Sequence, residues 1–242
     1  LLTSQTLAAI HIIALIKKEL MINVRKIGSS YIKTGGVYNT MGNKGAVYIY
    51  FKYKYLNLMF INTHLAAFKN NHDKRIDNFY YILSNIKIDD EEEYKKLFNE
   101  SGNYMPLVGN ELINKFDLNI FMGDLNSRSE CEFDLIEQMI ESKDVNKILS
   151  VDQLSYSREN RTIDMHGFEE CKITFMPTFK FVPGCIDTYA KTNDNTPSYT
   201  DRILYKLKKD KTIKLEILDY ISEPWVTFSD HKPVVFSFTL FF

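Results

Sequence analysis

The chain of 242 residues has little cysteine and lacks a long apolar run. Its cysteines are Cys131, Cys171 and Cys185. This odd, widely spaced set without a CxxC pair argues against a disulfide framework and against a cysteine zinc site. The longest apolar run, residues 7–16, is about half a membrane span, and its periodicity predicts a buried helix over residues 7–20. The cysteine content favours a reducing compartment, so we expect a cytoplasmic protein, with peripheral attachment to membranes left open.

An excess of charge of one sign is also absent. Lys and Arg number 30 and Asp and Glu number 31, which gives a net charge of −1 at pH 7. Without a long basic stripe, a groove for nucleic-acid backbone is not expected, and the nuclease class is disfavoured. Basic residues do gather between Lys17 and Lys54, where eight of them stand against the single acid Glu19. This stretch suits a phosphorylated headgroup or an anionic membrane surface, or it forms solvated strand edges.

Internal repeats and long linkers are absent as well, which favours one domain over residues 1–242, although the length alone allows two. The acidic run at residues 89–93 and the aperiodic stretch around it predict an insertion near residues 88–112. Helical periodicity occurs over residues 76–86 and 133–140. Runs rich in Val, Ile, Tyr and Phe predict strands over residues 46–51, 56–62, 118–122, 173–181, 202–205 and 234–240. The expected fold class is therefore α/β with a sheet core.

Polar clusters flank four of these strands, and open α/β sheets gather ligands at strand ends. Asn62 and His64 share one face because successive strand side chains alternate, and the same rule places Asp124 and Asn126 together. A carboxylate beside a carboxamide can hold a water or a metal-bound oxygen and can orient a nucleophile. The spacing therefore makes these side chains candidates for a reaction site.

Two further clusters, Asp230-His231 and Asp201-Arg202, offer a proton-transfer group and a phosphate-binding group. Histidine titrates near neutral pH, and a guanidinium suits bidentate contact with phosphate. Taken singly, the clusters of Asn62 and His64, of Asp124 and Asn126, and of Asp230-His231 are explained as well or better by a surface turn or a satisfied strand end, and Lys44 by a hairpin turn. Their joint occurrence favours a site.

Six motifs occur along the chain in the order found in the inositol polyphosphate 5-phosphatases, and the chain resembles this family over nearly its whole length. The motifs are Gly42-Asn43-Lys44-Gly45, Asn62-Thr63-His64-Leu65-Ala66-Ala67, Gly123-Asp124-Leu125-Asn126-Ser127-Arg128, Pro177-Thr178-Phe179-Lys180-Phe181, Pro197-Ser198-Tyr199-Thr200-Asp201-Arg202-Ile203-Leu204 and Ser229-Asp230-His231-Lys232-Pro233-Val234. The Asp-Leu-Asn and Ser-Asp-His elements alone indicate the wider endonuclease/exonuclease/phosphatase superfamily. The first, fourth and fifth motifs narrow the resemblance to the 5-phosphatases.

The resemblance implies a two-sheet mixed β-sandwich flanked by helices, a DNase I-like fold. It implies Mg²⁺-dependent removal of the 5-phosphate from a phosphoinositide, such as phosphatidylinositol 4,5-bisphosphate, or from a soluble inositol polyphosphate. Asp124 and Asn126 are implied to position and activate the attacking water, and His231 to contact the scissile phosphate with Asp201 holding and polarising it. Asp230 is implied to lie near the metal. Contacts to phosphates or to the pocket wall are implied for Asn43, Lys44, Asn62, His64, Lys180, Tyr199 and Arg202.

The chain also departs from the family pattern. The family has two strands upstream of its first helix, and a Glu on one of them is a principal Mg²⁺ ligand; neither strand precedes Leu1, so we expect an N-terminally truncated fold. Asn195 stands where the family tends to have a basic residue, with Lys191 the nearest cation, which leaves recognition of a 4-phosphate open. The alternative function is a catalytically impaired phosphoinositide-binding module. Loss of the Glu-bearing strand favours it, and joint retention of the four catalytic candidates argues against it.

Overall fold

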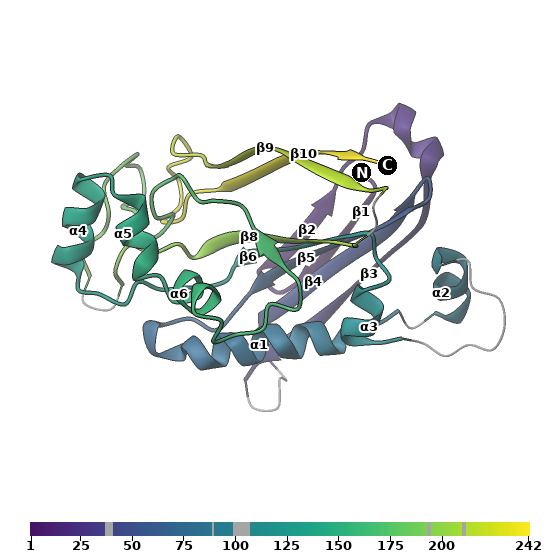
Figure 1. Ribbon diagram of the computed structural model, residues 1–242, viewed down its shortest axis with the longest axis horizontal. Helices are drawn as coiled ribbons and strands as arrows, with labels where there is room; N and C mark the ends of the chain where they lie inside the picture. The colour runs from purple at the N-terminus through teal and green to yellow at the C-terminus, as the bar shows by residue number, and fades with distance from the viewer. Residues whose placement is uncertain (37–40, 89, 99–106, 193–194, 210–211) are drawn as a thin grey trace. The chain divides into compact units, whose positions relative to one another are not determined.

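The computed structural model describes residues 1–36, 41–88, 90–98, 107–192, 195–209 and 212–242 (Figure 1). The chain divides into two compact units. Unit 1 comprises Leu1–Leu65, Asp77–Met122 and Tyr205–Ile213. Unit 2 comprises Ala66–Ile76, Gly123–Leu204 and Lys214–Phe242. Each unit is therefore assembled from three separate chain segments, and a single domain over residues 1–242 stays a prediction.

The main sheet of unit 1 begins with three antiparallel strands, β3 (Val24–Gly35), β4 (Met41–Tyr53) and β5 (Leu56–His64). Next in hydrogen-bonding order come β6 (Leu118–Asp124) and β8 (Asp201–Leu207), whose residues from Tyr205 onward belong to this unit. In the β4–β5 pair, Gly45 lies opposite His64. The predicted strands over residues 46–51, 56–62 and 118–122 are confirmed.

The N-terminal apolar run is a β-hairpin, so the predicted helix over residues 7–20 is wrong. Strands β1 (Thr3–Leu7) and β2 (Ile10–Ala14) pair antiparallel, and a 3₁₀ helix, Lys18–Asn23, follows them. Ile10 and Ile12 are buried and pack against Val47 and Ile49, while His11 and Ile13 are exposed. Burial that alternates from one residue to the next is typical of a strand with one buried face. Packing of that face against β4 stabilises the hairpin.

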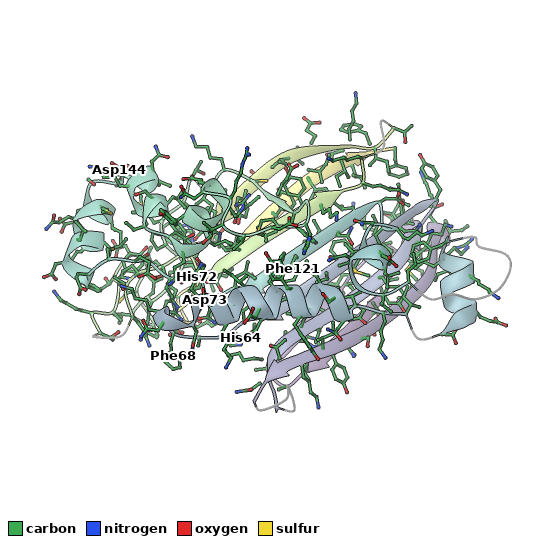
Figure 2. The ribbon with its side chains drawn as sticks, turned by 60° about the horizontal axis from the view of Figure 1, so that its bottom comes forward. His64, Phe68, His72, Asp73, Phe121 and Asp144 are labelled. Atoms are coloured by element: carbon green, nitrogen blue, oxygen red, sulfur yellow. The ribbon has the colours of Figure 1, made fainter. Side chains whose placement is uncertain are left out.

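Helices complete unit 1. The predicted helix over residues 76–86 is confirmed as α1 (His72–Asn85), whose residues from Asp77 onward belong to this unit. Its Phe79 ring meets the ring of Phe121, a β6 residue labelled in Figure 2, edge to face with centroids 5.1 Å apart. Helices α2 (Glu91–Phe98) and α3 (Gly109–Ile113) occupy the region of the predicted insertion. That insertion stays a prediction, and residues 89 and 99–106 within it lie outside the described residues.

Unit 2 contains helices α4 (Phe133–Glu141), α5 (Val145–Ser150) and α6 (Gln153–Glu159), the short strand β7 (Glu169–Glu170) beside β8, and a hairpin of β9 (Lys214–Ser222) and β10 (Val234–Phe241). Aspartates cap two of the helices: Asp144, labelled in Figure 2, accepts from the backbone of Lys147 in α5, and Asp152 accepts from the backbone of Ser155 in α6. The predicted helix over residues 133–140 and the predicted strands over residues 202–205 and 234–240 are confirmed.

The predicted strand over residues 173–181 is wrong. These residues form no continuous ladder; instead single bridges join Phe179 to Ser198 and to His231, and Phe181 to Tyr189. Pro177 has no backbone N–H to donate to a ladder, which explains why a run rich in β-formers stays irregular. Of the helices in the described residues, none has both the length and the apolar character that crossing a membrane requires. The predicted α/β class with a mixed sheet core is confirmed.

Candidate active site

A hydrogen-bonded Asp–His pair lies in unit 2, between the start of β8 and the segment that leads into β10. Nδ1 of His231 is 2.9 Å from Oδ2 and 3.2 Å from Oδ1 of Asp201. A carboxylate accepts only, so Nδ1 carries the proton and Nε2 is left for a ligand. The hydroxyls of Thr178 and Thr200 donate to the same Oδ2 at 2.7 and 2.8 Å, which fixes the carboxylate in place.

The surroundings of His231 favour its charged form. Burial lowers its pKa, but the hydrogen bond to Asp201 and the charges of Asp201, Asp124 and Asp230 outweigh burial, so that its pKa lies above the ordinary value. The imidazole is therefore more readily protonated than an exposed histidine at the same pH. A protonated imidazole suits contact with a phosphate.

The Asp124–Asn126 segment is tied to this pair by the backbone. The amide of Leu125 donates to the carbonyl of Thr200 at 2.7 Å, and the amide of Asn126 donates to Oδ1 of Asp124 at 2.9 Å. Asn126 has a φ of 53°, a conformation that Asn tolerates better than most residues. The predicted pairing of Asp124 with Asn126 therefore arises from a tight turn after β6, not from two positions on one strand.

Arg128 is a candidate site residue to which the sequence motifs assigned no role. It is buried, and its guanidinium donates to Oδ1 of Asn126 and, at 3.3 Å, to Oδ1 of Asn195. Its guanidinium carbon lies 4.4 Å from the centre of the Phe179 ring, and that ring lies 4.6 Å from the imidazole of His231. Burial lowers the pKa of Arg128, while the charges of Asp124 and Asp201 act to raise it. The signal available in the sequence was its spacing of two from Asn126.

Lys180 and Asp230 lie close together on the same unit. Nζ of Lys180 is 3.7 Å from Oδ2 of Asp230, and it lies 5.8 Å from the centre of the Phe179 ring. Both side chains are partly exposed, so the ion pair itself contributes little to stability. A partly exposed lysine beside the Asp201–His231 pair can contact a phosphate.

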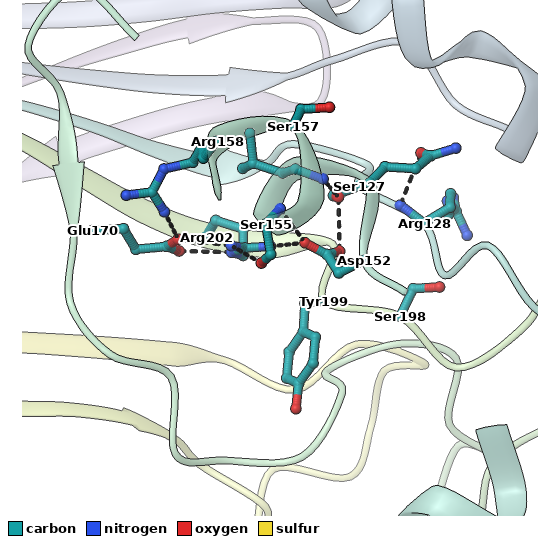
Figure 3. A network of polar contacts seen from close by, with 12 residues as sticks. Ser127, Arg128, Asp152, Ser155, Ser157, Arg158, Glu170, Ser198, Tyr199 and Arg202 are labelled. Atoms are coloured by element: carbon teal, nitrogen blue, oxygen red, sulfur yellow. Dashed lines mark hydrogen bonds and ion pairs between the residues drawn. The ribbon is translucent and has the colours of Figure 1, made fainter. Parts of the chain in front are cut away.

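Arg202 and Tyr199 are fully buried, and their geometry favours a supporting role over the predicted contact with substrate. The Arg202 guanidinium donates to Asp152 at 2.7 Å and to both carboxylate oxygens of Glu170 at 2.6 Å (Figure 3). Burial lowers its pKa, but the charges of Glu170 and Asp152 raise that pKa well above the ordinary value. The Tyr199 hydroxyl donates to the carbonyl of Phe175 at 2.8 Å.

The remaining predicted residues belong to unit 1. Nζ of Lys44 contacts Nε2 of His64, as the β4–β5 register allows, and Nδ2 of Asn62 donates to the carbonyl of His11 at 2.8 Å. Asn43 is exposed. Unit 1 thus brings Lys44 and His64 together, and unit 2 brings Asp124, Asn126, Asp201, His231, Lys180 and Asp230 together. That the two groups form one site stays a prediction.

Gly45 allows a close approach between the backbones of β4 and β3. Its φ is +146°, and a Cβ added there would lie 2.1 Å from the carbonyl oxygen of Ile32. Gly45→Ala is therefore expected to lower the free energy of unfolding by about 2 kcal/mol or more, since backbone cannot move aside as a side-chain tip can. Urea unfolding would measure the loss.

The matched control is Gly184→Ala. Gly184 also has a positive φ, of +90°, but its added Cβ would meet nothing within 4 Å. Backbone strain alone then costs about 1 kcal/mol. Equal losses for the two variants would contradict a steric role for the Ile32 contact.

The candidate site offers few groups that could bind a metal ion. The described residues contain no group of three or more His, Cys, Asp or Glu side chains placed to bind a metal ion. Asp230 offers one carboxylate. Mg²⁺ is commonly held by one or two carboxylates together with water and substrate phosphate. Asp230 therefore fits a site shared with a phosphate and does not by itself build a closed protein site.

Comparisons with known proteins agree with this chemistry. The profile of the family described as Endonuclease/Exonuclease/phosphatase family 2 matches residues 1–237. The chain is 30% identical over 247 residues to phosphatidylinositol 3,4,5-trisphosphate 5-phosphatase 2A of Danio rerio, covering 97% of the chain and 18% of that protein. It is 31% identical over 230 residues to type II inositol 1,4,5-trisphosphate 5-phosphatase of Mus musculus, covering 94% of the chain and 21% of that protein. The chain thus spans about a fifth of the length of these curated relatives.

A solved structure also resembles the chain. It is the inositol polyphosphate 5-phosphatase domain of SPsynaptojanin in complex with inositol (1,4)-bisphosphate and a calcium ion. The TM-score is 0.78 and the identity 27%, with 99% of the chain and 61% of that domain chain covered. The resemblance to 5-phosphatases and the DNase I-like fold class are confirmed.

Proposed function

Because the chain belongs to the endonuclease/exonuclease/phosphatase family 2, we propose that it is the catalytic region of a Mg²⁺-dependent phosphomonoesterase. It removes the 5-phosphate from phosphoinositides such as phosphatidylinositol 4,5-bisphosphate, or from soluble inositol polyphosphates. The observation that carries the proposal is the Asp201–His231 pair, joined by the Leu125–Thr200 backbone bond to the turn that holds Asn126. The named activities of the similar proteins support the same reaction.

Different residues have different roles in the hydrolysis. Asp124 and Asn126 position the attacking water, and Asp124 accepts its proton as the P–O bond to the inositol ring breaks; the ring oxygen takes up a proton from solvent water and leaves as a hydroxyl. His231, held by Asp201, donates from Nε2 to the phosphate, whose transition state spreads charge over its equatorial oxygens. Arg128 keeps Asn126 oriented through their hydrogen bond.

The phosphate contacts come from the remaining polar groups. Lys180 and the Lys44–His64 pair bind phosphates, with Asn43 and Asn62 at the pocket wall. Tyr199 and Arg202 hold the Asp201 segment in place from the protein interior and do not contact the substrate. Mg²⁺, with Asp230 as a ligand, would supply neutralisation of the phosphate oxygens when bound. A divalent ion is part of the similar synaptojanin structure, where it is calcium.

The setting of the reaction follows from the same residues. The three cysteines are free thiols, which suits the reducing cytoplasm. The partner is a phosphoinositide or inositol polyphosphate, met in solution or at an anionic membrane surface, and nucleic acid is not a partner.

The test is phosphate release with Mg²⁺ from phosphatidylinositol 4,5-bisphosphate vesicles and from inositol 1,4,5-trisphosphate. His231→Ala is expected to lower release by at least about 100-fold, because it removes a group that contacts the phosphate. His166→Ala is the matched control, since His166 pairs with Asp164 at 3.1 Å elsewhere in unit 2 and should change little. Headgroup binding without release from either substrate would contradict the phosphatase and support the binding module.

A further inference from the structure

A buried arginine outside the six motifs binds the segment that leads into α1. Arg75 lies on the part of α1 that belongs to unit 2. Its Nη1 donates to the carbonyls of Ala66 at 3.0 Å and Phe68 at 2.7 Å. Its Nη2 donates to the carbonyl of Lys69 at 3.3 Å and to Oε1 of Gln153. The planar fork of a guanidinium can hold four acceptors at once, which the ammonium of a lysine, with three donors, cannot do.

The Arg75 cation is enclosed although none of these acceptors is a carboxylate. All four are amide oxygens, whereas a buried charge is ordinarily paired with an opposite charge. Burial and the charge of Arg128 lower the pKa of Arg75 to about 10, so the guanidinium is still protonated at neutral pH. An apolar side chain would fill the same space without the cost of burying a charge. What distinguishes arginine here is therefore the set of oxygens that it orients.

Gln153, the first residue of α6, connects Arg75 to the turn after β6. Its side chain is buried, and its Oε1 accepts from Arg75 and, at 3.2 Å, from the backbone amide of Arg128. Its Nε2 donates to the carbonyl of Lys69 at 2.9 Å and to Oε1 of Glu130. Both donors and both acceptor positions of the side-chain amide are thus occupied, which leaves this amide a single orientation.

A path of hydrogen bonds leads from this glutamine to the candidate site. The backbone amide of Gln153 donates to the carbonyl of Arg128 at 3.0 Å, so Gln153 binds both backbone groups of that residue. The guanidinium of Arg128 donates to Oδ1 of Asn126, whose own backbone amide donates to Asp124. The path from Arg75 through Gln153 and Arg128 to Asn126 is unbroken and lies within unit 2.

The turn that contains Asn126 has separate attachments along its length. The amide of Leu125 is bound beside β8, the Ser127 hydroxyl is bound at the start of α6, and the backbone of Arg128 is bound by Gln153. Of these attachments, the last fixes the residue whose guanidinium orients the Asn126 carboxamide. A displacement of about 1 Å at a group that positions a reactant costs on the order of 100-fold in rate.

We infer that Arg75, acting through Gln153, is a positioning residue of the proposed reaction. It fixes the backbone of Arg128 and so holds the Asn126 carboxamide where the attacking water binds. The inference rests on the proposed function, because the water in question is that of phosphate release. Arg75 and Gln153 have no assigned contact with the substrate, so their loss should lower kcat and leave KM nearly unchanged.

Arg75→Lys and Gln153→Met test the path by its effect on turnover. The first keeps the charge but loses the fork, and the second keeps the length of the side chain but removes its hydrogen bonds. With Mg²⁺ and inositol 1,4,5-trisphosphate, kcat is expected to fall about tenfold and about 100-fold, with KM within about threefold of the parent. The double variant should lose no more than Gln153→Met alone, because both residues act along one path. The pH profile of kcat should keep its shape, since the Asp201–His231 pair is intact.

His72→Ala is the matched control for loosening of the two helices. His72, labelled in Figure 2, lies about one turn before Arg75 on α1, and its Nε2 hydrogen-bonds the Ser157 hydroxyl of α6 at 2.9 Å. It joins the same helices without a bond to Arg128. Its loss should lower Tm while kcat per folded molecule stays within about twofold of the parent. A fall in kcat equal to that of Gln153→Met would show that the helix contact, not the path, sets the rate, and would overturn the inference.

Hydrogen exchange adds a readout that needs no turnover. The Arg128 amide is bonded to Oε1 of Gln153, so Gln153→Met should speed its exchange at least about tenfold, whereas His72→Ala should not. Unchanged exchange in Gln153→Met, or unchanged kcat in both path variants of an active parent, would overturn the inference and leave the phosphatase standing. A parent chain that releases no phosphate from either substrate would instead overturn the proposed function, and with it any role of Arg75 in the reaction.

Discussion

Asp201→Asn is expected to lower the rate of phosphate release by about 10²- to 10⁴-fold while the protein stays folded. The change keeps the shape of the side chain but removes the negative charge that supports a protonated His231. It also presents an N–H₂ group where the Thr178 and Thr200 hydroxyls and His231 Nδ1 all need an acceptor. Steady-state kinetics and thermal unfolding would be measured together.

The chain offers a matched pair for this experiment. Asp164 and His166 form an Asp–His pair at 3.1 Å in the same unit, away from Thr178 and Thr200. Asp164→Asn should leave turnover within about twofold of the parent, as expected for a surface change. If Asp201→Asn did the same, the Asp201–His231 pair would have no part in the reaction.

Arg202→Met is expected to give the largest loss of stability, about 3–5 kcal/mol. The side chains of Arg202, Asp152 and Glu170 are almost completely enclosed, so removing the cation takes the ion pair from buried Asp152 and leaves Glu170 with the partly exposed Arg158. Asp152 also caps α6 and accepts from the Ser127 hydroxyl at 2.8 Å, next to Asn126. The damage should therefore reach the candidate site.

Arg158→Met is the comparison for that loss. Arg158 pairs with the same Glu170 at 2.6 Å, but its side chain is partly exposed. Water can replace part of its interaction, so about 1 kcal/mol is expected. Urea unfolding of the two variants would decide the matter, and an Arg202→Met protein as stable as Arg158→Met would show that the buried network contributes no more than a surface ion pair.

The sequence predicted elements well where the period was unambiguous. The helix α1 and the strands β4, β5 and β6 follow from it. The hairpin of β1 and β2 does not, because a short apolar run can satisfy both periods, and the turn at Ala8, with a φ of 51°, has no Gly, Pro or Asn to mark it. The segment forms a hairpin because its apolar side chains pack against β4, and no local pattern in the sequence reveals that contact.

The candidate site also has a part that local sequence predicts and a part that depends on tertiary packing. Motifs identified Asp124, Asn126, Asp201 and His231, because their spacing is local. They could not show that Arg202 is enclosed by Asp152 and Glu170, since partners so distant in sequence leave no periodic signal. The same limit hid Thr178 and Thr200, whose hydroxyls matter only once their segments lie beside Asp201. The motifs supplied the candidate reacting groups, and the tertiary structure shows which neighbouring side chains orient them.

The Leu125–Thr200 backbone bond has a consequence for folding. It joins two segments separated by α4, α5 and α6, so closing it requires the chain entropy of a long loop to be lost first. The local helices and the β9–β10 hairpin face no such requirement. Secondary structure should therefore return before the site does, and recovered phosphate release would report completed folding more strictly than recovered helix and strand content.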